Sequence, residues 1–487
     1  MHELTDKRVL VIGLGASGQA ACKLLLARGA RVTAADNADN ESLRRIANQL
    51  YAQGVTLHLG CQTAPLDAFD LAVVSPGVPP SSRLVSSVVQ RGIPLIGELE
   101  LAYQQSLCLN VAITGTNGKT TTTELVQRLL IHHQRKTIAA GNIGLPLSSV
   151  VDQTKDLDFL TLEVSSFQLE TIQFFRPVVA VMMNLTPDHF DRYSCMADYA
   201  RAKARMFMNQ QPFDWAIIQS EALAYLLTLG VKIPSKIITF SANSRRADIH
   251  LDRGLIISSM PDWSGPLLDM DTCHIRGQHN GENLMAALAV GRVLRLPLDS
   301  MQEALRSYQP AAHRCEPVAE INGVKYVNDS KATNLDAVHK ALLAMPAAKP
   351  GEPNIFLIAG GKDKGFDYHD IGPLLAQRVK RVFLLGETRE KLRAAWSLFT
   401  PCTLVDSLLE AVSEAARQAV PGDVVLLSPA CSSFDMFQNY QHRGEVFRRA
   451  VETLARGTSG GAVGTAPTNG VTAAPDKQTE NGSKGQN

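Results

Sequence analysis

One stretch of the sequence, residues 111–120, has the residue types and spacing of a phosphate-binding loop. An apolar run reaches Ile113, breaks at Thr114-Gly115 and ends in Gly118-Lys119-Thr120, and apolar residues at helical spacing follow. Glycines let backbone N–H groups approach an anion, and the start of a helix adds partial positive charge. This order predicts that Lys119 contacts the terminal phosphates of a nucleotide and that Thr120 holds Mg²⁺.

The loop departs from the usual phosphate-loop pattern at one position. That pattern has a glycine five residues before the Gly-Lys pair, and this sequence has Ile113 there. A strand-to-helix turn that binds no ligand is the alternative interpretation. Because Gly-Lys-Thr follows a buried strand, a nucleotide-binding loop is favoured.

Two further side chains that could bind a metal follow predicted buried strands. Glu163 ends the run that starts at Phe159, and His189 comes shortly after the run 178–183. Because parallel strands end at one edge of a sheet, we expect both side chains beside Thr120. Mg²⁺ prefers carboxylate and phosphate oxygens, so His189 is the less expected ligand. A lone Glu or His is more often a capping or solvated group, but three such groups at one edge favour a metal site.

The chain begins with a second glycine-rich turn. Gly13-Leu-Gly15-Ala-Ser-Gly18 follows a strand-like run and precedes a helical one, and Asp36 ends the next strand. This is the dinucleotide fingerprint, so a nicotinamide-dependent oxidoreductase is one hypothesis. The same spacing also serves other diphosphate ligands, or it packs a tight turn that binds nothing. A later strand enters the turn 75–77, and we interpret the segment as a domain that binds a phosphate-bearing substrate.

Polar side chains also collect in the later segments. Asn280 and Asn283 open a predicted helix, where they either cap it or recognise a base. Lys203 lies on a predicted helix, where a lysine is ordinarily solvated. Hydroxyl and ammonium groups at strand ends of the last third would suit an anionic small molecule, although ordinary loop polarity is the alternative; these are Lys331, Thr333, Lys364 and Ser433.

Composition excludes several classes of protein. The 487 residues are 45% apolar and carry a net charge of +1, which gives no reason to expect nucleic acid as a partner. The eight cysteines contain no CxxC pair, which argues against a disulfide framework or a zinc site. The N-terminus lacks the pattern of a signal peptide, and no apolar run reaches membrane-spanning length. We therefore expect a soluble cytoplasmic enzyme.

The fold class predicted from these patterns is α/β, with three domains. Residues 1–97 should form a Rossmann-like domain, residues 98–309 a P-loop ATPase-like domain with a parallel sheet, and residues 310–456 a second Rossmann-like domain. Residues 457–487 are rich in Gly, Ser, Thr, Ala and Pro with almost no large apolar side chain. Such a segment cannot bury enough surface to fold, so a disordered tail is predicted.

The order of motifs resembles the Mur ligases of peptidoglycan synthesis over about residues 7–455. The stretch 114–120 is similar to the ATP loop that these ligases share with folylpolyglutamate synthases. The stretches 163–170, 328–334 and 428–437 are similar to the branch that adds D-glutamate. Three positions differ from that branch, since Ala16 and Asn37 replace larger or more basic groups and Tyr440 replaces Phe.

The resemblance implies roles for individual residues. It implies an ATP site formed by Gly115, Thr116, Asn117, Gly118, Lys119, Thr120, Thr121, Asn280, Asn283, Arg314 and Asp329. It implies two Mg²⁺ ions, one held by Thr120 and Glu163 and the other by His189 and a Lys203 carbamylated by CO₂. It implies that the nucleotide substrate contacts Ser17, Asp36, Asn37, Ser75, Gly77, Asn142 and His189. D-Glutamate would contact Lys331, Thr333, Lys364, Ser433 and Tyr440.

The implied reaction is ATP-dependent amide formation between UDP-N-acetylmuramoyl-L-alanine and D-glutamate through an acyl phosphate, with Lys119, Glu163, His189, Lys203 and Arg314 as the catalytic groups. The expected partners are small molecules, with no nucleic acid, no membrane insertion and a monomeric chain. A sister Mur ligase or a ligase like the folylpolyglutamate synthases would share the mechanism and differ in the amino acid. A nucleotide-binding ATPase and the oxidoreductase are the alternatives from other classes.

Overall fold

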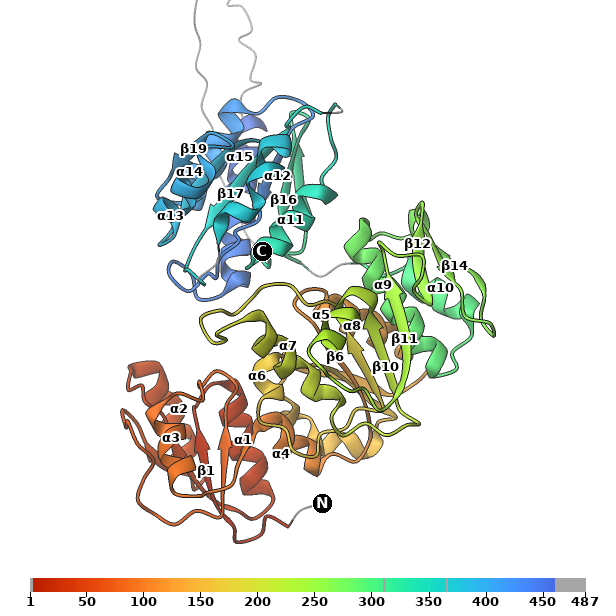
Figure 1. The fold of residues 1–487 in the computed structure, drawn as a ribbon. Coiled ribbons are helices and arrows are strands. Elements are labelled where there is room, and N and C mark those ends of the chain that lie inside the picture. Colours follow the sequence, from red (N-terminus) through yellow and green to blue (C-terminus); the bar gives the residue numbers. More distant parts are fainter. Residues whose placement is uncertain (1–2, 310–311, 350, 365–366, 460–487) are drawn as a thin grey trace, which may run out of the picture.

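The computed structural model describes residues 3–309, 312–349, 351–364 and 367–459. These residues form three α/β domains in chain order, and the central domain lies between the other two (Figure 1). Each sheet falls within one of the three predicted ranges, while the limits of those ranges stay predictions. None of the helices in the described ranges is long and apolar enough to span a membrane.

The first domain is a five-stranded parallel sheet with the order β3-β2-β1-β4-β5. The strands are β1 (Arg8–Ile12), β2 (Arg31–Ala35), β3 (Thr56–His58), β4 (Leu71–Val74) and β5 (Leu95–Gly97). The helices are α1 (Ala16–Ala27), α2 (Glu41–Tyr51) and α3 (Arg83–Gln90). Because successive connections leave β1 in opposite directions, a crevice opens at the carboxyl ends of β1 and β4, where open α/β sheets bind ligands.

The central domain is a nine-stranded sheet with the order β14-β13-β12-β11-β10-β9-β6-β8-β7. Its strands are β6 (Leu109–Thr114), β7 (Thr137–Gly141), β8 (Phe159–Glu163), β9 (Val179–Met182), β10 (Trp215–Gln219), β11 (Lys236–Ser241), β12 (Ile249–Asp252), β13 (Leu255–Ser258) and β14 (Gly265–Asp269). Its helices are α5 (Lys119–His132), α6 (Ser166–Leu169), α7 (Met196–Ala204), α8 (Ser220–Thr228), α9 (Gln278–Val293) and α10 (Leu298–Arg306). β6 carries the phosphate loop and lies between β8 and β9, so the residues that follow these three strands meet at one edge.

The prediction of a parallel central sheet is correct only in part. The strands from β7 to β12 pair in parallel, whereas β13 and β14 extend the sheet in antiparallel pairing. The reversal occurs at Arg253-Gly254, where φ is +49° and +86°. A two-residue loop with both φ angles positive has the twist that an antiparallel hairpin needs. The chain therefore turns back at this point without a crossover helix.

The third domain is a six-stranded sheet with the order β15-β16-β20-β17-β18-β19. Its strands are β15 (Glu316–Ile321), β16 (Val324–Asn328), β17 (Ile355–Gly360), β18 (Val379–Leu385), β19 (Cys402–Leu404) and β20 (Val424–Leu427), and its helices are α11 (Leu335–Ala344), α12 (Gly372–Arg378), α13 (Arg389–Trp396), α14 (Leu408–Gln418) and α15 (Tyr440–Ser459). Only β15 is antiparallel, after a second hairpin turn at Asn322-Gly323 with φ of +52° and +75°. The carboxyl ends of β16 and β20 are adjacent, and Asp329, which follows β16, lines a cavity together with residues of the central domain.

Helix α4 (Glu98–Gln105) joins the first domain to the second. Leu99 and Leu101 on this helix are buried in one apolar cluster that includes Val11 of β1 and Leu162 of β8. Burial of apolar side chains is the main favourable contribution to folding. Because the two domains share this core, α4 holds their ligand-binding edges in a fixed relation.

The closing helix is longer than the sequence predicts. α15 continues to Ser459, whereas the disordered tail was expected from Gly457. Phe447 and Val451 on this helix are fully buried against the third sheet. Once such contacts have formed a helix, one further turn adds backbone hydrogen bonds without needing apolar residues. The rest of the predicted tail, residues 460–487, lies outside the described residues.

Candidate active site

The phosphate loop connects the end of β6 to the start of α5. Gly115 and Gly118 have φ of +146° and +84°, in the region that favours glycine. A Cβ at Gly115 would lie 2.7 Å from Met183 Cβ, and a Cβ at Gly118 would lie 2.4 Å from Asn283 Oδ1. Both positions therefore need glycine for conformation and for space. The turn leaves its backbone N–H groups at the start of a helix, which suits a bound polyphosphate.

Lys119 is the first residue of α5, and its side chain folds back over the loop. Nζ donates hydrogen bonds to the carbonyl oxygens of Gly115, at 3.0 Å, and Thr116, at 2.8 Å. Burial lowers the pKa of Lys119 below its ordinary value, although the negative charges of Glu163 and Asp188 oppose this shift. The amine is thus held at the position where a nucleotide phosphate would replace the carbonyl oxygens as its partner.

Glu163, at the end of β8, lies beside the start of α5. Thr120 Oγ1 donates to Glu163 Oε2 at 2.6 Å, and Asn142 Nδ2 donates to Oε1 at 2.7 Å. Burial would raise the pKa of Glu163, but the charge of Lys119 and these hydrogen bonds hold it below its usual value. A hydroxyl and an ionised carboxylate in contact are oxygen ligands of the kind Mg²⁺ prefers. The pair fits a magnesium site.

His189 and Lys203 both lie close to the Tyr199 ring. Lys203 Nζ is 4.5 Å from the ring centroid and donates to Gly115 O at 2.8 Å, and the His189 ring centroid is 6.1 Å from that of Tyr199. Burial lowers the pKa of Lys203 well below its ordinary value, and the charge of Lys119 adds to the effect. Burial also lowers the pKa of His189 to about 4, against the opposing charge of Asp188. His189 is therefore neutral at pH 7, and burial disfavours the charged form of Lys203.

A second metal position would depend on chemistry that the unmodified side chains lack. In the described ranges there is no cluster of three or more His, Cys, Asp or Glu side chains that could hold a metal ion. A neutral imidazole at His189 can bind a metal, but an amine at Lys203 is not an oxygen ligand for Mg²⁺. The predicted set fits a second Mg²⁺ only if Lys203 carries a carboxylate.

A cavity of about 300 Å³ opens between the phosphate loop and the third domain. Many of the residues implied for ATP line it, namely Asn117, Gly118, Thr121, Asn280, Asn283, Arg314 and Asp329. Asn283 is held by Thr122 Oγ1, at 3.2 Å, and itself donates to Asn280 Oδ1 at 3.0 Å. Arg314 reaches across from the third domain, with Nη1 3.4 Å from Thr121 Oγ1. The cavity has the polar and cationic lining that a nucleotide needs.

Asp329 and Lys331 line the third-domain side of this cavity. Ser428 Oγ donates to Asp329 Oδ2 at 2.8 Å, and burial raises the pKa of Asp329 to about 7. Burial lowers the pKa of Lys331 to about 8, and the charges of Arg314 and Lys119 add to this shift. Lys331 and Arg314 of the third domain therefore lie close enough to Lys119 of the central domain for their positive charges to repel one another. An anionic ligand at this point would relieve their repulsion.

Four of the residues implied for D-glutamate lie in loops of the third domain, and the fifth, Tyr440, begins α15. Lys331 Nζ is 4.0 Å from the ring centroid of Tyr440, a cation–π contact, and Lys364 Nζ is 3.5 Å from Thr333 Oγ1. Ser433 is buried in the loop after β20. The structure thus brings four of the five residues into two contacting pairs, and the role of each in binding stays a prediction.

In the first domain, the implied substrate residues fall at separate places. Asp36, Asn37 and Gly77 line a cavity of about 220 Å³. The Asp36 carboxylate also closes the glycine-rich turn, since it accepts the backbone N–H of Leu14 at 2.8 Å and that of Ala38 at 2.9 Å. A carboxylate used in this way orders the turn as well as the cavity wall.

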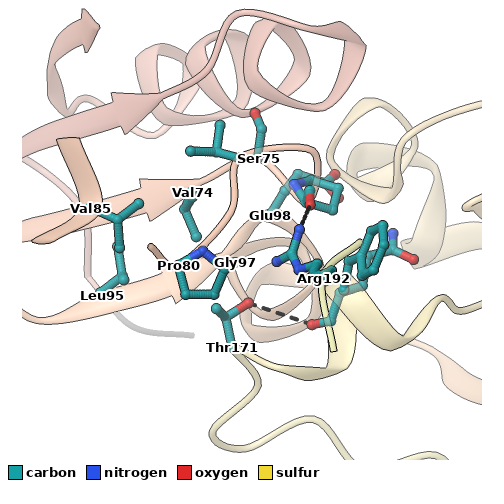
Figure 2. Close-up of a pocket in the computed structure, with 13 residues that line it drawn as sticks. Val74, Ser75, Pro80, Val85, Leu95, Gly97, Glu98, Thr171 and Arg192 are labelled. Atoms are coloured by element: carbon teal, nitrogen blue, oxygen red, sulfur yellow. Dashed lines mark hydrogen bonds between the residues drawn. The ribbon is translucent and has the colours of Figure 1, made fainter. Parts of the chain in front are cut away.

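Ser75 lies at a smaller cavity, of about 40 Å³, between the first and central domains (Figure 2). Its Oγ donates to Gly13 O at 2.8 Å, so it fixes the glycine-rich turn. Arg192 closes the same cavity from the central domain and donates to Pro76 O at 3.0 Å (Figure 2). Ser17 is half-buried at the start of α1 and is not part of the lining of either cavity. Asn142 contacts Glu163 in the central domain instead.

Several residues at this edge were not predicted. Asp188 is buried, and Lys364 Nζ lies 3.5 Å from its Oδ1. Asn184 accepts the backbone N–H of Asn117 at 2.8 Å, and Asn334 donates to Asp188 Oδ2 at 3.1 Å. Asp188 and Asn334 could have been found, because one precedes His189 and the other ends the motif 328–334. Their contacts join segments far apart in the sequence, so spacing alone does not reveal them.

His279 lines the nucleotide cavity, and its titration should affect stability. Burial, together with the charge of Lys340, lowers its pKa to about 4, so between pH 6.5 and 4 the folded chain binds fewer protons than the unfolded chain. The free energy of unfolding should therefore fall as the pH decreases through this window. His279→Gln should remove at most about 2 kcal/mol of that fall by about pH 5, measured by denaturant unfolding. Exposed His339→Gln is the control, and an equal pH dependence in wild type and His279→Gln would contradict the prediction.

Comparison with known proteins adds the family. The chain matches the models of the Mur ligase MurD-like N-terminal domain over residues 7–97, the Mur ligase middle domain over residues 113–291 and the Mur ligase glutamate ligase domain over residues 313–431. It is 41% identical over 462 residues to the UDP-N-acetylmuramoylalanine–D-glutamate ligase of Pelotomaculum thermopropionicum, covering 94% of this chain and 100% of the relative. Identity is also 41% to the enzyme of the same name from Acidobacterium capsulatum, over 92% of this chain and 97% of the relative.

Solved structures share the three-domain fold. A MurF ligase from Thermotoga maritima in complex with ADP aligns with a TM-score of 0.60 at 17% identity, over 93% of this chain and 100% of that chain. A pseudomurein peptide ligase type C from Methanothermus fervidus aligns with a TM-score of 0.57 at 17% identity, over 92% and 100%. At this identity the likeness concerns the fold alone.

Proposed function

The chain belongs to the Mur ligase family, and we propose that it joins D-glutamate to UDP-N-acetylmuramoyl-L-alanine with hydrolysis of ATP to ADP and phosphate. Relatives that are 41% identical over nearly the whole chain carry the name of this activity. The oxidoreductase alternative accounts for the first domain alone, and it leaves the phosphate loop and the third domain without a role. We also propose that the enzyme acts as a monomer in the cytoplasm.

One observation in the structure carries the proposal. Arg314 and Lys331 of the third domain line one cavity together with Asn117 and Gly118 of the phosphate loop, in which Lys119 is the next residue. Two domains that each supply cations to a shared cavity suit a reaction that joins an activated phosphate to an anionic amino acid. A binding ATPase would not need the cationic set of the third domain.

The first step activates a carboxylate. An oxygen of the L-alanyl carboxylate attacks the γ-phosphorus of ATP, the bond from that phosphorus to the β–γ bridging oxygen breaks, and ADP leaves. Negative charge spreads over the transferred phosphoryl group, so Lys119 and Arg314 would stabilise it and orient the phosphates. Mg²⁺, which Thr120 and Glu163 would hold, supplies charge neutralisation when bound.

The second step forms the amide. The neutral amine of D-glutamate attacks the acyl carbonyl carbon, the carbon–oxygen bond to the phosphoryl group breaks, and inorganic phosphate leaves as the amine loses its proton. Lys331 and Lys364 would hold the two carboxylates of D-glutamate by charge, with Thr333 and Ser433 as hydroxyl donors and Tyr440 beside Lys331. The protein therefore works mainly by positioning two anions that would otherwise repel each other.

Lys203 would contribute as a carbamate. Burial lowers its pKa and so favours the neutral amine, the form whose lone pair can attack CO₂. A nitrogen–carbon bond forms and a proton leaves, which converts the amine into an anionic oxygen ligand. Such a group beside His189 would complete the donor set of a second Mg²⁺, the fit that the unmodified lysine does not give.

Phosphate release tests the function directly. Purified protein with ATP, Mg²⁺ and UDP-N-acetylmuramoyl-L-alanine should release phosphate only when D-glutamate is added. L-Glutamate, L-alanine, L-lysine and meso-diaminopimelate serve as matched amino acids. Release with one of these instead would assign the chain to a sister ligase, and release without any amino acid would indicate a binding ATPase.

A further inference from the structure

The central and third domains meet at a line of hydrogen bonds that the reaction scheme does not use. Asn117 of the phosphate loop donates from Nδ2 to Asp336 Oδ2, and the amides of Asn117 and Asn334 lie 3.4 Å apart in both directions. Thr186 Oγ1, from the loop after β9, donates to the same Asp336 oxygen at 3.3 Å. We call these four residues the seam.

The central-domain side of the seam is held in place by its own backbone contacts. Asn184 accepts the backbone N–H of Asn117 at 2.8 Å and donates to its carbonyl oxygen at 3.1 Å. The Asn117 side chain makes its hydrogen bonds to the third domain instead, with Asn334 and Asp336. The backbone of the phosphate loop is thus held within the central domain, independently of the third domain.

On the third-domain side, the seam occupies the first turn of α11. Asn334 caps this helix, since its Oδ1 accepts the backbone N–H of Ala337 at 2.9 Å. Asp336 follows in the first turn, where a carboxylate is favoured by the helix dipole, and it pairs with Lys340 at 2.9 Å. Its side chain is 21% exposed.

A carboxylate beside a phosphate loop needs a physical reason, because it would repel the phosphates of a bound nucleotide. Three donors converge on Asp336 Oδ2, and two of them, from Asn117 and Thr186, belong to the other domain. The Asp336 carboxylate thus accepts hydrogen bonds from the central domain, which joins the two domains. A residue chosen only to begin α11 would not need these partners.

The same segment carries residues of the amino-acid site. Thr333 precedes Asn334 in the chain, and Lys364 contacts both Thr333 and the buried Asp188, to which Asn334 also donates. The seam therefore links the loop that would hold the γ-phosphate to the groups that would hold D-glutamate. A displacement of about 1 Å between reacting groups can cost about a hundredfold in rate.

We propose that Asp336 is a positioning residue for amide formation: through Asn117 and Thr186 it fixes the D-glutamate segment of the third domain against the phosphate loop. This inference rests on the proposed ligase function. It assigns the residue to the second half-reaction, in which the amine must reach the acyl phosphate. The first half-reaction would use the first and central domains together with Arg314 and Asp329 of the third domain, and neither of these two residues belongs to the seam.

Asp336→Ala tests the proposal. The kcat for D-glutamate-dependent phosphate release should fall about twentyfold and the KM for D-glutamate should rise several-fold. The KM for UDP-N-acetylmuramoyl-L-alanine should stay within about twofold, because that substrate contacts the other two domains. Acyl phosphate trapped with hydroxylamine in the absence of D-glutamate should form at nearly the wild-type rate. A general structural defect would lower both half-reactions.

Two matched variants separate the hydrogen bonds from other effects. Asp336→Asn keeps an acceptor oxygen for Asn117 and Thr186, so it should recover most of the activity. Asp299→Ala removes an exposed carboxylate from the first turn of another helix, α10, and should change nothing. An unchanged kcat in Asp336→Ala, an equal loss of acyl-phosphate trapping, or an Asp336→Asn variant as slow as Asp336→Ala would each overturn the proposal.

Solution X-ray scattering provides an arm that does not depend on the reaction. Wild-type protein with ADP should have a smaller radius of gyration than Asp336→Ala with ADP, since the variant loses contacts between domains. If the wild type releases no phosphate with D-glutamate, the proposed function fails, and scattering still decides whether the seam holds the domains. Equal radii of gyration in the two proteins would contradict the proposal that the seam holds the central and third domains together.

Discussion

Replacing Lys119 with alanine should lower the kcat for phosphate release about a thousandfold. The amine lies at the start of α5 and donates to the loop carbonyl oxygens of Gly115 and Thr116, where it can reach the phosphates. The charge that develops on the transferred phosphoryl group has no substitute for this cation on the loop itself. Binding of UDP-N-acetylmuramoyl-L-alanine should change less than about threefold, because its nucleotide part would occupy the first domain. Steady-state phosphate release and calorimetric titration measure the two quantities.

The control for this variant is Lys155→Ala, which removes an exposed lysine from the same domain. It should leave both quantities unchanged. A Lys119→Ala protein that loses substrate binding and turnover to the same degree would contradict the division between a substrate domain and an ATP domain. Retained turnover would instead remove the phosphate loop from the reaction.

The sequence predicted the parallel parts of the fold because their signals are local. A buried run followed by a glycine turn and a helical pattern identifies β1, β6 and their helices, and the repeated order implies parallel sheets. The antiparallel additions were missed, although Asn322-Gly323 is a strong hairpin signal between two short strands. At Arg253-Gly254 the signal is weaker, because a non-glycine residue adopts positive φ there. The conformation of such a turn depends on the pairing of the strands on both sides of it, here β12 and β13.

The site was predictable where one motif carries the chemistry. Lys119, Thr120 and Glu163 follow from residue type and from the shared edge of a parallel sheet, and the structure brings them into contact. Asp336 follows from nothing in its own neighbourhood, since an acid in a first helical turn is common on exposed helices. Its partners lie 219 and 150 residues away in the sequence. Contacts between domains depend on how the domains pack, and local spacing does not record that.

The burial of Lys203 also could not be predicted from local sequence. A lysine on a helix is ordinarily expected to be solvated, but Lys203 is only 2% exposed. Among its described hydrogen bonds, it donates to the loop carbonyl oxygen of Gly115. Its burial results from the packing of α7, which also carries Tyr199, against the phosphate loop. The resemblance to Mur ligases singled it out, and the structure adds that burial lowers its pKa, although the carboxylates of Asp188 and Glu163 oppose this shift.

Lys203→Met should lower kcat about a hundredfold while the protein stays folded, because methionine fills the same volume without a nitrogen that can react with CO₂. Wild-type activity should fall in CO₂-depleted buffer and return when bicarbonate is added, whereas the variant should respond to neither change. Carbon NMR with isotopically labelled bicarbonate should show a carbamate signal in the wild type alone. Thermal unfolding checks that the variant is folded.

The alternative role for Lys203 is a structural one, in which the amine only anchors the loop through Gly115 O. The two roles differ in what restores activity. If a carboxylate is needed beside His189, Lys203→Ala should be partly rescued by acetate or formate, since a small carboxylate can enter the space that the side chain leaves. A loop anchor would gain nothing from these anions, because they cannot donate to a carbonyl oxygen. Exposed Lys136→Met is the control for added salt. Rescue by carboxylates and not by chloride would thus assign Lys203 to the metal site. Wild-type activity that does not change when bicarbonate is removed or added would assign Lys203 the structural role in the loop.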